Sequence, residues 1–173
     1  LLTSKGPFFF SDTTVNVNPT ADQLVEIVGL TASGVRFFNI EPRVAMLSYS
    51  NFGSAKGEVA SKTALATAMA KAKYPELVIE GEMQANVAVN EDIQKETYPF
   101  SALIGQRANT LIFPDLSSGN IAYKLLSELG NAEAIGPVLL GMNKPVHILQ
   151  LGSSIRDIIN MVAIAVVDAQ TKD

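Results

Sequence analysis

The sequence contains no cysteine and a single histidine, His147. The lack of cysteine excludes disulfides, thiolate metal ligands and a cysteine nucleophile, and one histidine excludes a histidine-rich metal site. No apolar run approaches the roughly 18 to 20 residues that a membrane span needs. Lysine and arginine form no block and the formal net charge is −4. We therefore expect no metal, no membrane segment and no nucleic-acid partner.

The composition that remains, 47% hydrophobic and 17% charged over 173 residues, fits one globular domain. The opening stretch LLTSKGPFFFSD has neither the pattern of a signal peptide nor an initiator methionine. We interpret residues 1–173 as a single α/β domain that is a fragment of a longer cytoplasmic protein.

Strand patterns alternate with helix patterns along the chain. Strands are expected over 8–18, 43–50, 76–83, TLIF (110–113) and 145–150, and helices over 58–74, 121–130 and 153–170, with a further helix capped by Asn18 and beginning at Pro19. Residues 90–99 are expected to form a surface loop, and 134–142 a strand or a loop. This alternation predicts a three-layer α/β fold, a largely parallel sheet with helices on both faces. The last helix is apolar nearly all round, which indicates a central helix or an interface.

Small polar residues gather in three strand-to-helix loops: SYSNFGSAKG, PDLSSGN and LGSS. If the strands are parallel, the three loops lie at one edge of the sheet, and their hydroxyls and free backbone N–H groups suit a phosphate or a carboxylate. Each loop could instead simply cap its own helix. None is a Walker loop or a dinucleotide fingerprint.

Individual polar residues allow two interpretations. Asp115 and Asp157 could act as a base or hold a ligand hydroxyl, but a Pro-Asp turn and a carboxylate in the first helical turn are also ordinary structure. Ser154 and Asp157 stand at capping-box spacing. His147 is expected to be packed and hydrogen-bonded, and Glu80 and Glu82 to share one face of a solvated strand end rather than to form an acid/base pair.

The segment LIFPDLSSGNIAYKLLSELGNAEAIGPVLLGMNKPVHIL resembles the most recognisable part of the phosphate acetyl/butyryltransferase family. RVAMLSYSNFGSA and ELVIEGEMQANVAV are similar to two further family segments, in the same order. The resemblance implies the second subdomain of a phosphotransacetylase or isocitrate-dehydrogenase-like fold. It also implies that the first half of the family's domain is missing, and that this half forms the opposite wall of a coenzyme A cleft.

The same resemblance implies a catalytic Ser-Arg pair, then Gly, and an Asp that assists deprotonation of the coenzyme A thiol. Here these positions are Gln150, Leu151, Gly152 and Asp157. Leucine cannot stabilise the charge that a positioned arginine would stabilise, whereas glutamine can still hold a ligand. This departure predicts a site that binds without turning its ligand over.

The ending PVHILQ…DIINMVAIAVVDAQ and the stretch FFFSDTTVNVNPTADQLVEI are similar to the C-terminal phosphotransacetylase-like domain of large bacterial NADP-dependent malic enzymes. That resemblance implies a module that senses acetyl-CoA and helps to build a homo-oligomer. NADP and a divalent metal would belong to an absent upstream domain, with no cofactor in this fragment. Leu151 departs from this group as well, where arginine is often retained.

We therefore expect a regulatory module that binds acetyl-CoA or a related acyl-CoA. The alternatives are an active phosphate acetyltransferase and a purely structural oligomerisation domain. The expected ligand-binding residues are Ser48, Ser50, Asn51, Ser54, Asp115, Asn120, Gln150 and Asp157.

Overall fold

A parallel sheet of four strands forms the centre of the computed structural model, which describes residues 1–171. Its strands are β3 (Phe9–Ser11), β4 (Arg43–Leu47), β5 (Val78–Met83) and β6 (Thr110–Ile112), in the order β3-β6-β4-β5. A short antiparallel pair, β1 (Leu2–Thr3) and β2 (Gly6–Pro7), precedes the sheet.

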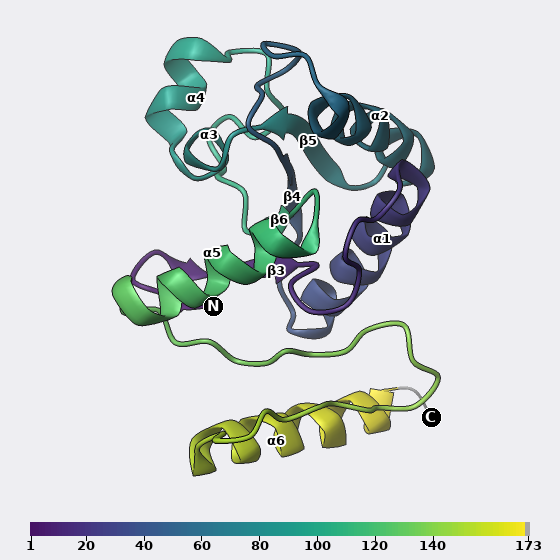
Figure 1. The fold of residues 1–173 in the computed structure, drawn as a ribbon, viewed down its shortest axis with the longest axis vertical. Helices are drawn as coiled ribbons and strands as arrows, with labels where there is room; N and C mark the ends of the chain where they lie inside the picture. The colour runs from purple at the N-terminus through teal and green to yellow at the C-terminus, as the bar shows by residue number, and fades with distance from the viewer. Residues whose placement is uncertain (172–173) are drawn as a thin grey trace.

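Helices cover both faces of this sheet, which confirms the predicted three-layer α/β class (Figure 1). On one face, α1 (Ala21–Phe37) and α2 (Glu58–Lys73) enclose a core that includes Leu24, Val28, Met46, Ala66 and Ile112. On the other face lies a second core with α3 (Ala85–Val89), α4 (Glu91–Thr97) and α5 (Leu116–Leu129), which includes Ala45, Met83, Val87, Leu103 and Phe113.

The start of α1 differs from the expected cap at Asn18. Thr20 is the N-cap: its hydroxyl accepts a bond from Gln23 N at 3.3 Å, and Gln23 Oε1 accepts from Thr20 N at 2.9 Å. This reciprocal capping box satisfies two backbone donors, so it sets the start of the helix two residues later. Asn18 is left free to bind a side chain from another helix.

Two further expectations are wrong. Residues 91–97 form α4 rather than a loop, because buried Gln94 donates from Nε2 to the carbonyls of Val87 (2.7 Å) and Ala88 (3.2 Å). The strand expected over 8–18 ends at Ser11, where the chain turns around the Asp12 carboxylate.

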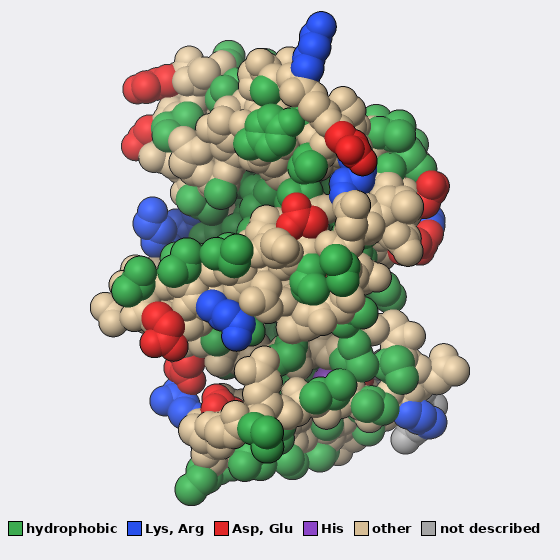
Figure 2. Space-filling model, in the orientation of Figure 1, with side chains coloured by type: hydrophobic (Ala, Val, Ile, Leu, Met, Phe, Trp, Pro, Cys, Tyr) green, Lys and Arg blue, Asp and Glu red, His purple; other side chains and the backbone are tan. Residues whose placement is uncertain are grey.

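The strand expected over 145–150 is also absent, and residues 134–150 run as irregular chain between α5 and the last helix, α6 (Ile155–Thr171). Figure 1 shows α6 apart from the sheet, so it is not a central helix of the described chain. Its apolar side chains lie at the surface, among them Ile155, Ile159, Val162 and Val166 (Figure 2). Within residues 1–171, no helix has both the length and the apolar character to cross a bilayer.

Candidate functional site

The loop that follows β4, residues 48–56, lies at the carboxyl edge of the sheet, where ligands bind in open α/β folds. Its backbone is already hydrogen-bonded within the protein. The N–H groups of residues 50, 51 and 52 donate to Ser48 Oγ, Ser54 Oγ and Glu82 O, respectively. The N–H groups of residues 53, 54 and 55 donate to Glu82 Oε1, Asn51 O and Ser50 Oγ. The expectation that this loop offers free N–H groups from residues 50–55 to an anion is therefore wrong.

Beneath this loop lies a buried carboxylate, Glu82, that is 3% exposed. Its Oε1 accepts from the Ser50 hydroxyl at 2.8 Å and from Gly53 N at 2.6 Å. Ser50 is itself fully buried, so its hydroxyl shapes the loop from inside. The interpretation of Glu82 as a solvated residue is wrong because the loop folds over the end of β5 and covers it.

Glu80, two residues earlier on β5, is buried as well, at 4% exposure. Its carboxylate pairs with Lys71 of α2 and accepts from Ala102 N at 3.0 Å. A carboxylate in this position is neutralised by a structural ion pair, which accounts for its burial.

Three predicted residues of the same loop remain partly or largely accessible: Ser48, Asn51 and Ser54. Asn51 Oδ1 accepts from Gln84 N at 2.8 Å, and Gln84 Nε2 donates to Tyr49 O at 2.7 Å. These two bonds tie the loop to the segment after β5 and hold its outer side chains in place.

The second loop, after β6, uses its predicted residues to begin α5. Asp115 is the N-cap, and its Oδ1 accepts from Ser118 N at 2.8 Å. Asn120 donates from Nδ2 to Thr13 O at 3.1 Å, which links α5 to the turn after β3. The capping interpretation thus accounts for the contact of Asp115, whereas Asn120 makes a tertiary contact within the protein.

A lysine that the sequence analysis did not single out joins these loops. Lys62 of α2 extends to the sheet edge, where its Nζ donates to Asn18 Oδ1 at 2.7 Å and to Pro114 O at 2.9 Å. Both partners are uncharged, so the positive charge is not neutralised by them. Only the fold reveals this contact, because Asn18 and Pro114 follow different strands.

The third loop lies outside the sheet, because residues 145–150 form no strand. Gln150 and Leu151 are exposed, Leu151 completely. Gly152 has φ +90°, a conformation that favours glycine. The expectation that all three loops follow strands of one sheet holds for the first two loops only.

Asp157 forms the predicted capping interaction at the start of α6. Its Oδ2 accepts from Ser154 Oγ and from Ser154 N, both at 2.8 Å, and Ser154 Oγ accepts from Asp157 N at 3.2 Å. The hydrogen bonds from the Ser154 side chain and backbone lower the pKa of Asp157 below its ordinary value.

His147 is packed against the irregular segment as expected, with Nδ1 accepting from Leu139 N at 3.3 Å. No three acidic or histidine side chains among residues 1–171 gather as a metal site would require.

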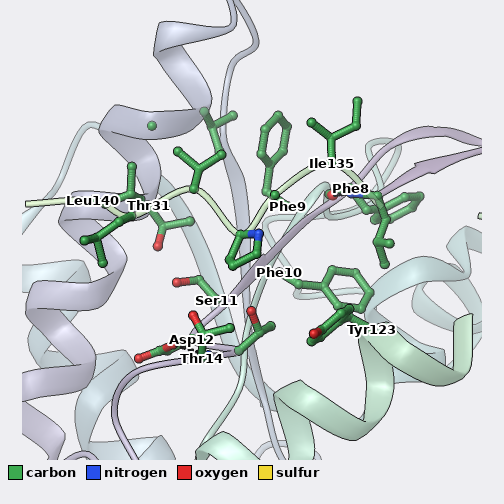
Figure 3. Close-up of a pocket in the computed structure, with 18 of the residues that line it drawn as sticks. Phe8, Phe9, Phe10, Ser11, Asp12, Thr14, Thr31, Tyr123, Ile135 and Leu140 are labelled. Carbon is green, nitrogen blue, oxygen red and sulfur yellow. Dashed lines mark hydrogen bonds between the residues drawn. The ribbon is translucent and has the colours of Figure 1, made fainter. Parts of the chain in front are cut away.

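An apolar cavity of about 500 Å³ lies beside β3, and none of the predicted site residues lines it. Its walls come from β3, the turn after it, the inner face of α1, Tyr123 of α5 and residues 134–140 (Figure 3). Sequence patterns did not indicate it, because it forms where the irregular segment covers the open edge of the sheet.

Comparisons with known proteins agree with this architecture. The family model described as phosphate acetyl/butaryl transferase matches residues 1–166. An NADP-dependent malic enzyme of Haemophilus influenzae is 48% identical over 98% of this chain and 22% of that protein. A phosphate acetyltransferase of Clostridium acetobutylicum is 46% identical over 96% of the chain and 50% of that protein.

Among solved structures, a phosphotransacetylase from Streptococcus pyogenes superposes with a TM-score of 0.88 and 42% identity, over 94% of this chain and 49% of that one. The chain thus spans about half the length of these transferases and a smaller share of the malic enzyme. It belongs to the phosphate acetyl/butaryl transferase family.

Proposed function

We propose that this chain is part of a regulatory module that binds acetyl-CoA or a related acyl-CoA without transferring the acyl group. The observation that carries the proposal is Leu151. It stands fully exposed in the turn before α6, where the family resemblance implies an arginine. An alkyl side chain neither donates a hydrogen bond nor carries charge, so it cannot stabilise a transferring phosphoryl group.

The state of Asp157 supports the loss of chemistry. A general base for a thiol is most effective when its pKa lies near the working pH. Hydrogen bonds from the Ser154 side chain and backbone lower the pKa of Asp157 instead, which makes this carboxylate a weaker base.

Lys62 supports binding of a phosphate-bearing ligand. Its ammonium group has three N–H donors, of which two bind Asn18 and Pro114. The residue is partly exposed, so the third donor is available to an anion at the sheet edge. Charge-assisted bonds of this kind are among the stronger contacts in proteins.

The regulatory part of the proposal rests on the relatives. A chain 48% identical to part of a malic enzyme fits a module whose acyl-CoA occupancy alters malate oxidation elsewhere in a longer protein, where NADP and a divalent metal would act. The exposed apolar stripe of Ile155, Ile159, Val162 and Val166 on α6 supports packing of this helix against the missing first half or another subunit in a homo-oligomer.

Calorimetric titration of acetyl-CoA into the full-length protein tests the proposal, together with a coupled assay for acetyl phosphate. Binding with no turnover is the expected result. The double variant Gln150→Ser with Leu151→Arg should gain measurable acetyl-phosphate formation, whereas Ser4→Arg, an exposed position, should not. Absence of binding in the unaltered protein would overturn the proposal and favour a purely structural role.

The second candidate is an active phosphate acetyltransferase. Gly152 and Asp157 keep the residues that the family resemblance implies, and they form the expected turn and helix start. Acetyl-phosphate formation by the unaltered full-length protein would establish this candidate in place of the first.

A further inference from the structure

The outer face of α5 carries a contiguous row of apolar side chains. Ile121, Leu125 and Leu129 stand four residues apart, and each is more than half exposed. Residues at this spacing lie along one side of a helix, and these three form what we call the α5 stripe. Figure 2 shows a row of hydrophobic side chains along this helix. A single exposed leucine is ordinary, but a contiguous apolar patch marks an interaction surface.

The inner side of α5 is fixed to the turn after β3. Gly119 is buried, and a Cβ at this position would lie 2.4 Å from Asp12 O. The next residue, Asn120, donates from Nδ2 to Thr13 O at 3.1 Å. These contacts determine which side of α5 faces outward. The α5 stripe is therefore held on a rigid element, which lowers the entropy cost of binding a partner.

Two opposite charges line one flank of the α5 stripe. Lys124 and Glu128 are both exposed, and their spacing of four residues places them on the same flank. No ion pair joins either one to another side chain of residues 1–171. The other flank carries Ala122 and Leu126, which are uncharged.

This pattern is complementary to itself. When two copies of a helix run antiparallel about a two-fold axis, each flank meets the same flank of the other helix. With the axis at Leu125, that side chain packs on its own copy. Lys124 then lies beside Glu128 of the partner subunit, because their positions along the helix differ by two residues, about 3 Å. The axis creates a second, reciprocal pair, whereas a parallel pairing would place the charged flank on the apolar one.

We propose that α5 forms the centre of a two-fold interface with a second copy of this chain, in which the two α5 helices run antiparallel. This inference rests on the homo-oligomer of the proposed function and is independent of its ligand. The reciprocal charges favour a second copy over an unrelated surface. A standard interface buries about 800 Å² on each partner, more than one face of a helix of 14 residues supplies, so neighbouring surface forms the rim.

Leu125→Glu tests the apolar contact in the full-length protein, whose mass is measured by sedimentation equilibrium over a range of concentrations. The change places two carboxylates against each other at the axis. We expect the dissociation constant of this contact to rise at least about hundredfold, and the mass to halve. Leu65→Glu on α2 is the matched control, because Leu65 is exposed to a similar extent, and it should leave the mass unchanged. The proposal is overturned if the unaltered protein is a monomer, or if Leu125→Glu lowers only the melting temperature and leaves the mass unchanged.

Exchanging the two charges tests the antiparallel register. Lys124→Glu and Glu128→Lys each convert both reciprocal pairs into like-charge contacts, and each should raise the dissociation constant about tenfold at low salt. The double variant restores opposite charges, so its dissociation constant should return to within about twofold of the original. A double variant weaker than either single variant would overturn the proposal. Titration with acetyl-CoA separates the two proposals: if the rescue occurs in a protein that binds no acetyl-CoA, the interface stands and the proposed ligand is refuted.

Discussion

Replacing Glu82 by alanine should destabilise the loop after β4 and with it the whole chain. The Glu82 carboxylate is 3% exposed and holds Ser50 Oγ at 2.8 Å and Gly53 N at 2.6 Å. A hydrogen bond to a charged group contributes about 1.5 to 3 kcal/mol. Water can reach the exposed Gly53 after the change, but not the buried Ser50. Adding the loss of packing, we expect the free energy of unfolding to fall by about 3 kcal/mol.

Glu82→Gln is the matched variant, because its amide oxygen can still accept both bonds and only the charge is lost. We expect it to lower the free energy of unfolding by about 1 kcal/mol. Urea unfolding followed by circular dichroism measures each value, with Glu76→Ala as an exposed control. Ser50→Ala combined with Glu82→Ala should lose about 1 kcal/mol less than the sum of the single changes. The assigned contacts would be refuted if Glu82→Ala lowered the free energy of unfolding by less than about 1 kcal/mol. They would also be refuted if Glu82→Ala and Glu82→Gln lowered it equally.

Further changes test other contacts. Lys62→Met should weaken acetyl-CoA binding by the full-length protein at least about tenfold, while exposed Lys5→Met leaves it unchanged; equal effects would remove Lys62 from the site. Burial raises the pKa of Asp12, but bonds from Thr14, Asn16 and Val15 outweigh it, so the folded pKa lies below the ordinary 3.8. The stabilisation that the ionised Asp12 carboxylate contributes is therefore complete above about pH 5 and is lost as pH falls through the folded pKa. Urea unfolding at a series of pH values should show the difference in free energy of unfolding between the unaltered protein and Asp12→Asn shrinking over that range. A difference that stays constant with pH would contradict the lowered pKa. Gly119→Ala places a Cβ 2.4 Å from Asp12 O and should lower the free energy of unfolding by about 2 kcal/mol, whereas an unchanged urea midpoint would show that α5 can move away.

The sheet was largely predictable because its strands carry their own signals. RVAML is apolar between a proline and a polar loop, and it forms β4 at Arg43–Leu47. The apolar pattern of PVHIL is equally strong, yet residues 145–149 form no strand. A strand needs a neighbour to bond its backbone, and no strand of the described chain lies beside this segment. The local sequence pattern indicates that a segment favours the strand conformation, but it does not indicate whether a partner strand is present.

The prediction of a loop over residues 90–99 was wrong for the opposite reason. They have few apolar side chains, so their pattern favours a loop. Gln94 nevertheless lies buried and donates to two carbonyls of α3, and Ile93 and Tyr98 pack against the core. A helix of seven residues is too short to be stable alone, so these tertiary contacts maintain α4. The burial of Glu80 and Glu82 was likewise hidden, since Lys71 and Ser50 come from separate elements.

The candidate site differs from the predicted one because the backbone N–H groups of its first loop are already hydrogen-bonded within the protein. Three polar loops suggested an anion held by free N–H groups, but residues 50–55 use all of theirs internally, and Asp115 caps α5. If an anion binds at this edge, its recognition depends on side chains such as Lys62, whose two bonded partners are uncharged. A single flexible lysine can attract a phosphate, but it does not supply the planar, bidentate clamp that an arginine gives. Leucine at position 151, fully exposed in the turn before α6, supplies neither a charge nor a hydrogen-bond donor from its side chain.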